Sequence, residues 1–278
     1  MNYKMTKKEA KEQISNKLSH FFGVTPEEAT YEHYYKAIAL ILRDMMMHGR
    51  KEFHNESKTS DSKKVYYLCM EFLMGRSLKN NLYNLNLTKT MESALKDFGI
   101  KLENLYDCEP DAGLGNGGLG RLVACYLDGL ATQGYFAKGY TILYEYGIFK
   151  QKLVDGWQTE MPDFWLPGGD VWLVPHEEEA VDIKFEGWVD EIWDHCYHNV
   201  EQRDAKIVKA IPHDMYVAGK DGRGISVLRL WSAKAPGLDM DMFNQGDYMR
   251  AMEHNAMAEV ISRCFILLTI IPRERAFA

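Results

Sequence analysis

Apolar side chains recur at helical spacing near the start of the chain. Between residues 25 and 50 they stand three and four positions apart, at Tyr34, Ile38, Ile41, Leu42 and Met45 among others. This spacing places them on one face of an amphipathic helix. Thr25, Pro26 and Glu28 have the pattern of a capping box with proline at the first helical position. The helix is therefore predicted to begin there and to run to about Arg50.

The remaining pattern mixes strands and helices. The polar stretch 55–64 predicts a loop, and the aromatic, mostly apolar stretch 65–72 predicts a buried strand. Helical spacing returns in residues 78–98, after residue 118 and in residues 244–262. Further strands are predicted at residues 139–149, 181–188 and 224–231. We find neither an internal repeat nor a low-complexity linker.

Composition narrows the class of protein. The 278 residues are 46% hydrophobic and 26% charged, which is ordinary for a soluble globular chain and excludes a disordered or fibrous one. The net charge of -7 argues against a nucleic-acid partner, which normally requires a clustered basic face. Neither a signal peptide nor a membrane span is apparent in the sequence, so we expect no membrane partner.

Cysteine usage points to the compartment. The five cysteines are widely scattered and form no CxxC pair: Cys69, Cys108, Cys125, Cys196 and Cys264. This pattern predicts neither a disulfide framework nor a zinc ribbon. A reducing, cytoplasmic location is the simplest expectation.

The most distinctive segment is glycine-rich. Residues 111–122 read DAGLGNGGLGRL, with five glycines in eight residues, and open directly into a predicted helix. Glycine lets backbone approach a ligand, and a helix start presents N–H groups and a positive dipole end to an anion such as phosphate. A tight turn that requires positive φ explains a glycine cluster equally well. Both interpretations remain open from the sequence.

The same loop satisfies the GxGxxG pattern twice, which makes a dinucleotide site the obvious rival. That fingerprint requires a hydrophobic strand before the glycines and an acidic residue about 20 positions later. Here the preceding residues LENLYDCEPD are too acidic for a buried strand, and position 138 is a lysine. The dinucleotide reading is therefore disfavoured.

Four longer segments resemble successive signatures of the α-1,4-glucan (glycogen and maltodextrin) phosphorylases. They are MEFLMGRSL at 70–78, EPDAGLGNGGLGRL at 109–122, YEYGIFKQ at 144–151 and LRLWSAKAP at 228–236. The resemblance covers residues 25–263, which we expect to form an incomplete N-terminal phosphorylase domain after a tail or helix at 1–24. It implies an α/β fold, namely the N-terminal half of a two-domain, GT-B-like glycosyltransferase with a Rossmann-like sheet.

The resemblance also implies an activity. Members of this family use inorganic phosphate to cleave the terminal α-1,4 bond of a glucan and release glucose 1-phosphate, with pyridoxal phosphate as a general acid/base cofactor. The family's cofactor lysine, catalytic histidine and most phosphate-binding cations lie in parts without a counterpart here. The chain alone is therefore expected to be inactive, with no complete set of catalytic residues.

Carried over by motif, a set of residues is expected to line the cleft for cofactor and substrate phosphates: Glu71, Asn116, Gly117, Gly118 and Leu119. A structural pairing of Glu71 with Arg76 or Arg121 is an equally good reading. Some relatives have a tyrosine where this chain has Leu73, so no aromatic contact is expected there.

The predicted helix at 244–262 resembles the family's tower helix, which packs against its counterpart in a homodimer. The expected interface residues are Asn244, Tyr248, Met249 and Met252. A two-fold dimer would use the same face of this helix in both chains. An ordinary core helix is the alternative.

The resemblance stops after Arg263. Residues 264–278 read CFILLTIIPRERAFA, whereas a reading frame moved back by one base permits a peptide similar to the family's continuation. We therefore expect an aberrant tail produced by a frameshift in the gene or in its sequencing. Its apolar, β-prone stretch 265–271 would favour aggregation if exposed.

The sequence leaves room for rival functions. A retaining glycosidase would need a carboxylate pair, for which Glu160 and Asp163 are candidates. The cluster Asp194, His195, Cys196 and His198 lacks a complete metal-ligand set, so we interpret it as ordinary surface residues and expect no metal. The rival from another class is a non-catalytic module that binds glucan or pairs with a phosphorylase through the tower-like helix.

Overall fold

The computed structural model describes residues 3–59, 63–194, 197–237, 240–244 and 246–264. Helices and strands are both abundant, and the expected α/β class is confirmed. The α-helices are α1 Lys7–Phe22, α2 Tyr31–Thr59, α3 Ser77–Asn84, α4 Thr88–Lys96, α5 Leu102–Tyr106, α6 Gly118–Gln133, α7 Leu166–Gly169, α8 Met240–Asn244 and α9 Tyr248–Arg263. Short 3₁₀ helices are η1 Asp170–Trp172, η2 Glu177–Glu179 and η3 Lys220–Gly222.

One mixed sheet forms the centre of the molecule. The strands are β1 Lys64–Leu68, β2 Phe136–Ile142, β3 Lys150–Val154, β4 Trp157–Met161, β5 Leu173–Pro175, β6 Val181–Phe185, β7 Trp188–Asp194, β8 Tyr197–Arg203, β9 Lys206–Ala218 and β10 Ile225–Lys234. The sheet order is β1-β2-β10-β9-β5, with β6 also paired to β9. β1, β2 and β10 run parallel to one another, and β9 is antiparallel to β10, β5 and β6.

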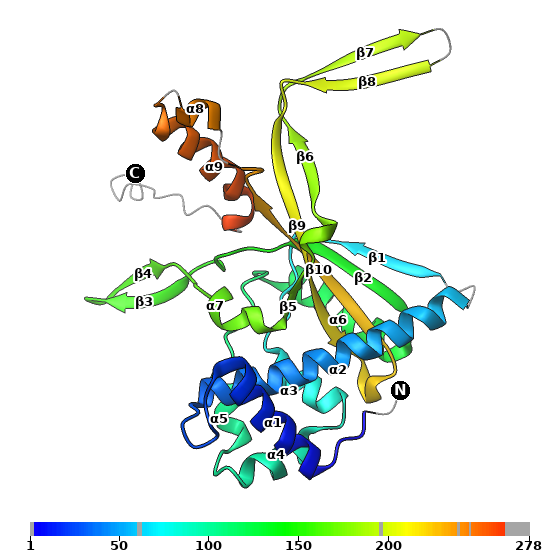
Figure 1. Cartoon of the computed structure of the whole chain (residues 1–278), viewed down its shortest axis with the longest axis vertical. Coiled ribbons are helices and arrows are strands. Elements are labelled where there is room, and N and C mark those ends of the chain that lie inside the picture. Colours follow the sequence, from blue (N-terminus) through cyan, green and yellow to red (C-terminus); the bar gives the residue numbers. More distant parts are fainter. Residues whose placement is uncertain (1–2, 60–62, 195–196, 238–239, 245, 265–278) are drawn as a thin grey trace.

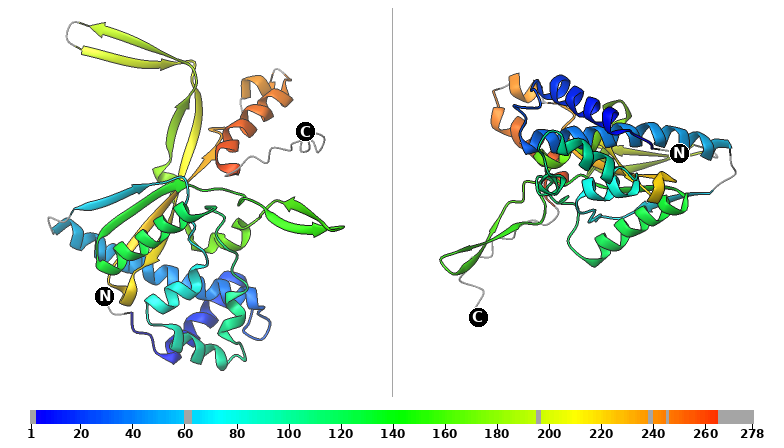
Figure 2. Two further views of the ribbon diagram at one scale, coloured as in Figure 1. Left: turned by 180° about the vertical axis from the view of Figure 1, so that it is seen from behind. Right: turned by 90° about the horizontal axis from the view of Figure 1, so that it is seen from below.

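Helices α2 and α6 cover opposite faces of this sheet. On one face the Phe53 ring of α2 lies 4.2 Å from the Phe136 ring of β2. On the other, the Ser226 hydroxyl of β10 donates to the Leu127 carbonyl of α6 at 3.0 Å. Figures 1 and 2 show the long α2 crossing the sheet. In Figure 1 the helices α1, α3, α4 and α5 are gathered below α2. The result is a layered α/β core.

The core is continuous from the helical layer into the sheet. Fully buried side chains of α2 include Tyr34, Tyr35 and Ile38, and those of β10 include Ile225 and Leu228. Burial of these apolar side chains is the main favourable contribution to folding and opposes the loss of conformational entropy.

Three elements project from the core: the hairpins β3–β4 and β7–β8, and the pair α8–α9 (Figures 1 and 2). β9 is 13 residues long and pairs with β6 near its start and with β5 nearer its end, so it connects the base of the β7–β8 hairpin to the core. α9 is held by its C-terminal end, where the Ser262 hydroxyl accepts a hydrogen bond from the Ala233 N–H at 2.9 Å.

The predicted start of the first long helix was wrong. Glu28 does accept a hydrogen bond from the Thr25 N–H, at 3.0 Å, but these residues close an isolated turn and α2 begins only at Tyr31. α2 also continues to Thr59, through much of the stretch predicted as a loop. A complete capping box instead lies at Thr6 and Glu9, where it starts α1 within the segment predicted as tail or helix.

Other boundaries moved by a few residues. The stretch 78–98 is divided into α3 and α4, and β2 begins at Phe136 and ends at Ile142, earlier than predicted. The last helix begins at Tyr248 instead of 244, where α8 ends. Of the tail 264–278, only Cys264 lies within the described residues, where it forms an isolated parallel bridge with Tyr146.

Within the described residues, no helix is both long and apolar enough to cross a membrane.

Candidate functional site

The glycine loop is held against the segment that follows β1. The Phe72 N–H donates to the Leu114 carbonyl at 2.8 Å, and the Leu73 N–H donates to the Gly120 carbonyl at 3.0 Å. Two backbone segments more than 40 residues apart are therefore joined on both sides of the loop. This pairing fixes where α6 begins relative to the end of β1.

Glu71 lies against the loop. Its Oε2 accepts a hydrogen bond from the Asn116 N–H at 3.1 Å. Arg121 donates to the carbonyls of Leu73 and Met74, at 3.4 Å each, while Arg76 pairs with Asp107 at 3.3 Å. The structure thus brings Glu71 to the predicted phosphate loop and gives the two arginines other partners.

Gly115 and Gly120 are required by close approach and not by backbone angle. None of the five loop glycines, all of which are described, has positive φ. A Cβ on Gly115 would lie 3.1 Å from the Leu73 backbone nitrogen, and one on Gly120 would lie 2.9 Å from Glu71 Oε2. The alternative of a tight turn requiring positive φ is therefore wrong.

Gly113 marks a second tight contact. A Cβ there would overlap the Trp165 ring and lie 2.7 Å from the Gly147 Cα. Trp165 is buried, and its indole N–H donates to the Tyr144 carbonyl at 2.9 Å. The loop is thus wedged between two later segments of the chain.

Gly117 and Gly118, in contrast, face open space. Nothing lies within 4 Å of a Cβ built on either residue, and Asn116 and Leu119 beside them are exposed as well. Gly117 is the N-cap of α6 in an extended conformation, and no side chain caps that helix. The first N–H groups of a helix lack intrahelical partners, and the dipole makes this end positive. The geometry therefore suits an anion.

Glu109, in the same motif, caps a different helix. It is 3% exposed, and its carboxylate accepts from the N–H groups of Ser77 and Leu78 at the start of α3 and from the Trp172 indole at 2.8 Å. Burial raises the pKa of Glu109, whereas these hydrogen bonds act to lower it. Sequence reasoning assigned it no role, because Asp107 and Asp111 flank it and nothing in the sequence distinguishes the three acids.

A second charged cluster lies on the α2 face of the sheet. Arg229 of β10 donates to both oxygens of Asp214 on β9, at 2.7 and 2.8 Å, and also to Glu179. The hydrogen bonds to Asp214 raise the pKa of Arg229. Arg229 lies within the quoted LRLWSAKAP motif, and a charge inside an apolar strand was the signal that it has a buried partner.

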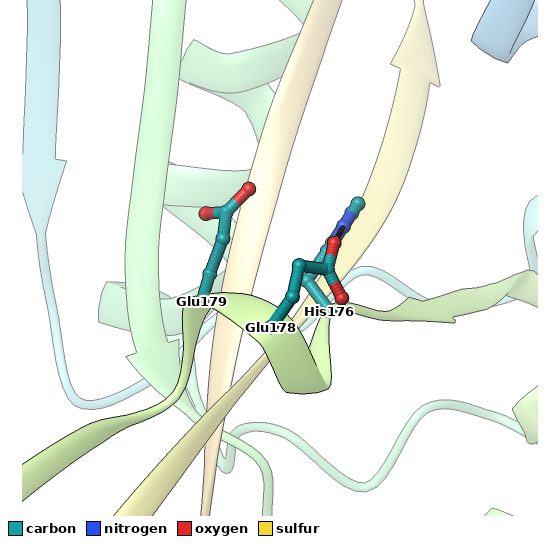
Figure 3. Close-up of side chains that lie close together, drawn as sticks. All are labelled: His176, Glu178 and Glu179. Atoms are coloured by element: carbon teal, nitrogen blue, oxygen red, sulfur yellow. Dashed lines mark hydrogen bonds and ion pairs between the residues drawn. The ribbon is translucent and has the colours of Figure 1, made fainter.

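His176, Glu178 and Glu179 approach one another at η2, and their potential ligand atoms lie within 4.8 Å of each other (Figure 3). His176 Nδ1 is 3.1 Å from Glu178 Oε1, and Glu179 is engaged by Arg229. With one of its three members committed to a guanidinium, the cluster is best described as part of an ion-pair network.

The rival carboxylates lie on the β3–β4 arm and just after it. Glu160 is exposed on β4 opposite Gln151, and Asp163 forms an ion pair with Lys150 at 3.3 Å. Of the cluster at 194–198, which was interpreted as ordinary surface residues, His195 and Cys196 lie outside the described residues. His198 stacks on Trp193, with ring centroids 4.1 Å apart.

The predicted interface residues are exposed. Tyr248, Met249 and Met252 on α9 are 54%, 75% and 62% exposed, and Asn244 at the end of α8 is exposed too. The buried part of α9 lies further along, at Ala258 and Ser262. Among the side chains of α9 that the structure describes, those before Ala258 are exposed or half-buried.

Comparisons with known proteins agree with the motifs. The family model described as carbohydrate phosphorylase matches residues 95–266. The chain is similar to the human brain and liver forms of glycogen phosphorylase, at 42% identity over 250 and 252 residues, each covering 89% of the chain. It is 41% identical over 241 residues to glycogen phosphorylase of Chlamydia pneumoniae, which covers 86% of the chain. The chain spans 29% of the length of these relatives. Because the family model matches more than half of the chain, the chain belongs to the carbohydrate phosphorylase family.

Proposed function

We propose that this chain supplies the phosphate-binding loop and part of the substrate cleft of an α-1,4-glucan phosphorylase. The reaction is the phosphorolysis of the terminal α-1,4 bond of a glucan. A phosphate oxygen bonds to the anomeric carbon, the glycosidic bond breaks, and a proton passes to the leaving oxygen, which gives glucose 1-phosphate and a shortened glucan.

The observation that carries the proposal is the open start of α6. Gly117 and Gly118 offer backbone N–H groups at an uncapped helix N-terminus, with no neighbouring atom within 4 Å of their Cβ positions. Backbone donors of this kind favour negative charge without titrating, so they hold an anion at any working pH. A phosphate-dependent reaction requires such a site.

Pyridoxal phosphate is the cofactor proposed for the complete enzyme, and the loop fits its phosphate on the same grounds. When bound, it supplies general acid/base chemistry. Asn116 would hold the loop in position through its N–H bond to Glu71, and Gly117, Gly118 and Leu119 would direct backbone N–H groups at phosphate oxygens. No lysine is assigned here to attach the cofactor.

We further propose that the chain is inactive alone, that the active form is a homodimer formed through α9, and that its location is cytoplasmic. The exposed Tyr248, Met249 and Met252 support the dimer, since an exposed apolar helix face needs a partner. A glucan-binding or dimerising module without activity is the alternative favoured by the same surface.

The test compares the chain with a chimera in which residues 1–263 replace the matched part of the Chlamydia pneumoniae relative. We expect release of glucose 1-phosphate from maltodextrin by the chimera, in the presence of phosphate and pyridoxal phosphate, and none by the chain. Gly118→Val in the chimera should lower the rate at least tenfold. The matched control is Gly129→Val further along α6, where a Cβ also meets nothing within 4 Å. Activity of the chain alone, or a Gly118→Val chimera at full rate, would refute the proposal.

A further inference from the structure

Two segments of the chain, residues 70–78 and 109–122, lie against each other. At one end of the pair, the Leu73 N–H donates to the Gly120 carbonyl at 3.0 Å, and a Cβ on Gly115 would lie 3.1 Å from the Leu73 nitrogen. This end carries the start of α6, whose open N–H groups form the proposed anion site. The position of that helix start therefore depends on how the two segments are aligned.

Glu109 joins the two segments at their other end. Its carboxylate accepts hydrogen bonds from the Ser77 and Leu78 N–H groups, at 2.7 and 2.9 Å, where the first segment enters α3. The Trp172 indole of η1 donates to the same carboxylate at 2.8 Å. Three donors from two other parts of the chain therefore hold one side chain, which is 3% exposed.

The chain between Glu109 and the anion site is closely packed. Pro110 lies against Gly168, where a Cβ would be 3.1 Å from the proline Cγ. A Cβ on Gly113 would overlap the Trp165 ring. Close-packed interiors transmit a displacement instead of absorbing it. A shift at Glu109 would therefore reach the glycine loop.

We infer that Glu109 is a positioning residue for the anion site: it fixes the alignment of the two segments and thereby the place of the Gly117 and Gly118 N–H groups. The inference rests on the proposed function. Groups that bind a reacting ligand have to be held within about 0.5 Å of their working positions. A small misalignment would therefore weaken phosphate binding in a chain that is still folded.

An ordinary helix cap is the alternative role for Glu109. Loss of a cap lowers the fraction of folded protein, but leaves the affinity of the folded fraction for phosphate unchanged. Loss of a positioning contact lowers that affinity. Phosphate binding by the folded chain therefore distinguishes the two roles.

Glu109→Gln removes the contact at nearly constant side-chain size. An amide has one acceptor oxygen, so at least one of the three donors would face an NH2 group. In the isotope-labelled full chain, we expect the Gly117 and Gly118 amide resonances to move and inorganic phosphate to bind at least tenfold more weakly. The matched control is Asp107→Asn, two residues earlier, where the acid is 85% exposed and pairs with Arg76 at 3.3 Å. It should change neither the resonances nor the affinity.

Kinetics of the chimera give a second measurement. Glu109→Gln should raise the KM for phosphate at least tenfold and leave the KM for maltodextrin within twofold. Should that variant fold poorly, Trp172→Phe removes one donor and leaves the bonds to α3, and it should raise the KM for phosphate at least threefold.

Two results would overturn the inference. One is that the Gly117 and Gly118 resonances stay in place in folded Glu109→Gln, and the other is that Asp107→Asn has an equal effect. A failure of the proposed function would look different. The resonances would then move with the substitution at Glu109 but would not respond to phosphate in the wild-type chain, which would refute the anion site and retain the alignment role of Glu109.

Discussion

At Gly115 the space available to a side chain is set by another segment of backbone. A Cβ there would lie 3.1 Å from both the nitrogen and the Cβ of Leu73, and Leu73 is itself hydrogen-bonded to the loop through Gly120. Backbone in this position cannot rotate away as a side-chain tip can. An added methyl group would therefore strain the backbone contact between Leu73 and the loop, which positions α6.

Gly115→Ala should accordingly destabilise the folded chain by about 1–3 kcal/mol, the usual cost of overpacking. Gly118→Ala is the matched control. Its Cβ would meet open space in the first turn of α6, where alanine is a better helix former than glycine, so its effect should be neutral or slightly stabilising. Urea unfolding measures both, and equal losses for the two variants would contradict this reading of the loop.

Tyr3 gives a pH-dependent prediction. Burial and the nearby Glu52 carboxylate raise the pKa of Tyr3 to about 12, from an ordinary value near 10. A raised folded-state pKa means that the unfolded chain releases the proton first. The resulting stabilisation is complete below pH 10 and is lost as the pH rises from about 10 to 12.

Tyr3→Phe has no such proton. The free energy of unfolding of the wild type should therefore fall relative to that of the variant across this pH range. Parallel urea titrations at pH 8, 10 and 11.5 would measure the difference. A difference that stays constant with pH would show that the Tyr3 phenol is not buried as described.

Among the elements, α2 shows which features of a helix a sequence pattern can locate and which it cannot. The apolar spacing of residues 34–45 correctly predicted a helix, because those side chains do face the core. The capping pattern at Thr25 and Glu28 does form its hydrogen bond, but it closes a turn before Tyr31. A local signal of this kind identifies a hydrogen bond and not the element that follows it.

In the candidate site, too, local features were predictable from the sequence and long-range contacts were not. The loop composition indicated an anion site at the start of a helix, and the structure places Asn116 to Leu119 exposed at that start. The contacts of Glu71 with Asn116 and of Glu109 with α3 were not predictable, since they join residues 30 or more positions apart. A charged residue whose partner is distant in the sequence produces no periodic pattern from which the partner could be predicted.

Arg229 of β10 is hydrogen-bonded to Asp214 of β9 and to Glu179 of η2, so its removal should destabilise the fold. Asp214 is 6% exposed and would lose its bidentate partner in Arg229→Met. Breaking a buried pair while leaving one charge behind costs roughly 3–5 kcal/mol. Thermal or urea unfolding should show that loss.

Arg203→Met on the β7–β8 hairpin is the control. Arg203 pairs with Asp190 at 2.9 Å, with its side chain 46% exposed, and surface pairs contribute little. Its unfolding midpoint should stay close to that of the wild type. A small effect of Arg229→Met would mean that the Asp214 carboxylate reaches solvent.

At the scale of the whole molecule, the layered core and the projecting arms should differ in local stability. The first six residues of β10 are buried, whereas the described residues of β7 and β8 are mostly exposed. Segments with few buried contacts open at low free-energy cost.

Amide exchange in the β7–β8 hairpin should therefore be at least a hundredfold faster than in residues 225–230 of β10. Exchange measured by mass spectrometry on the whole chain resolves the two regions. Equal protection would indicate that the hairpin is covered in solution, for instance by a second copy.

The contact between Gly113 and Gly147 can be used to recognise this architecture in other sequences. Their backbones meet at a point where the loop before α6, the segment after β2 and the Trp165 indole converge, and a side chain on Gly113 would overlap that ring. A side chain on Gly147 would meet only the Asp163 side chain, whose carboxylate could turn aside, so Gly113 is the position that is closed to substitution for steric reasons. In a search for distant homologues, a glycine at both positions, together with the tryptophan, is a stricter criterion than the glycine loop alone. A candidate with a larger residue at the position of Gly113 would have to carry its loop in a different conformation.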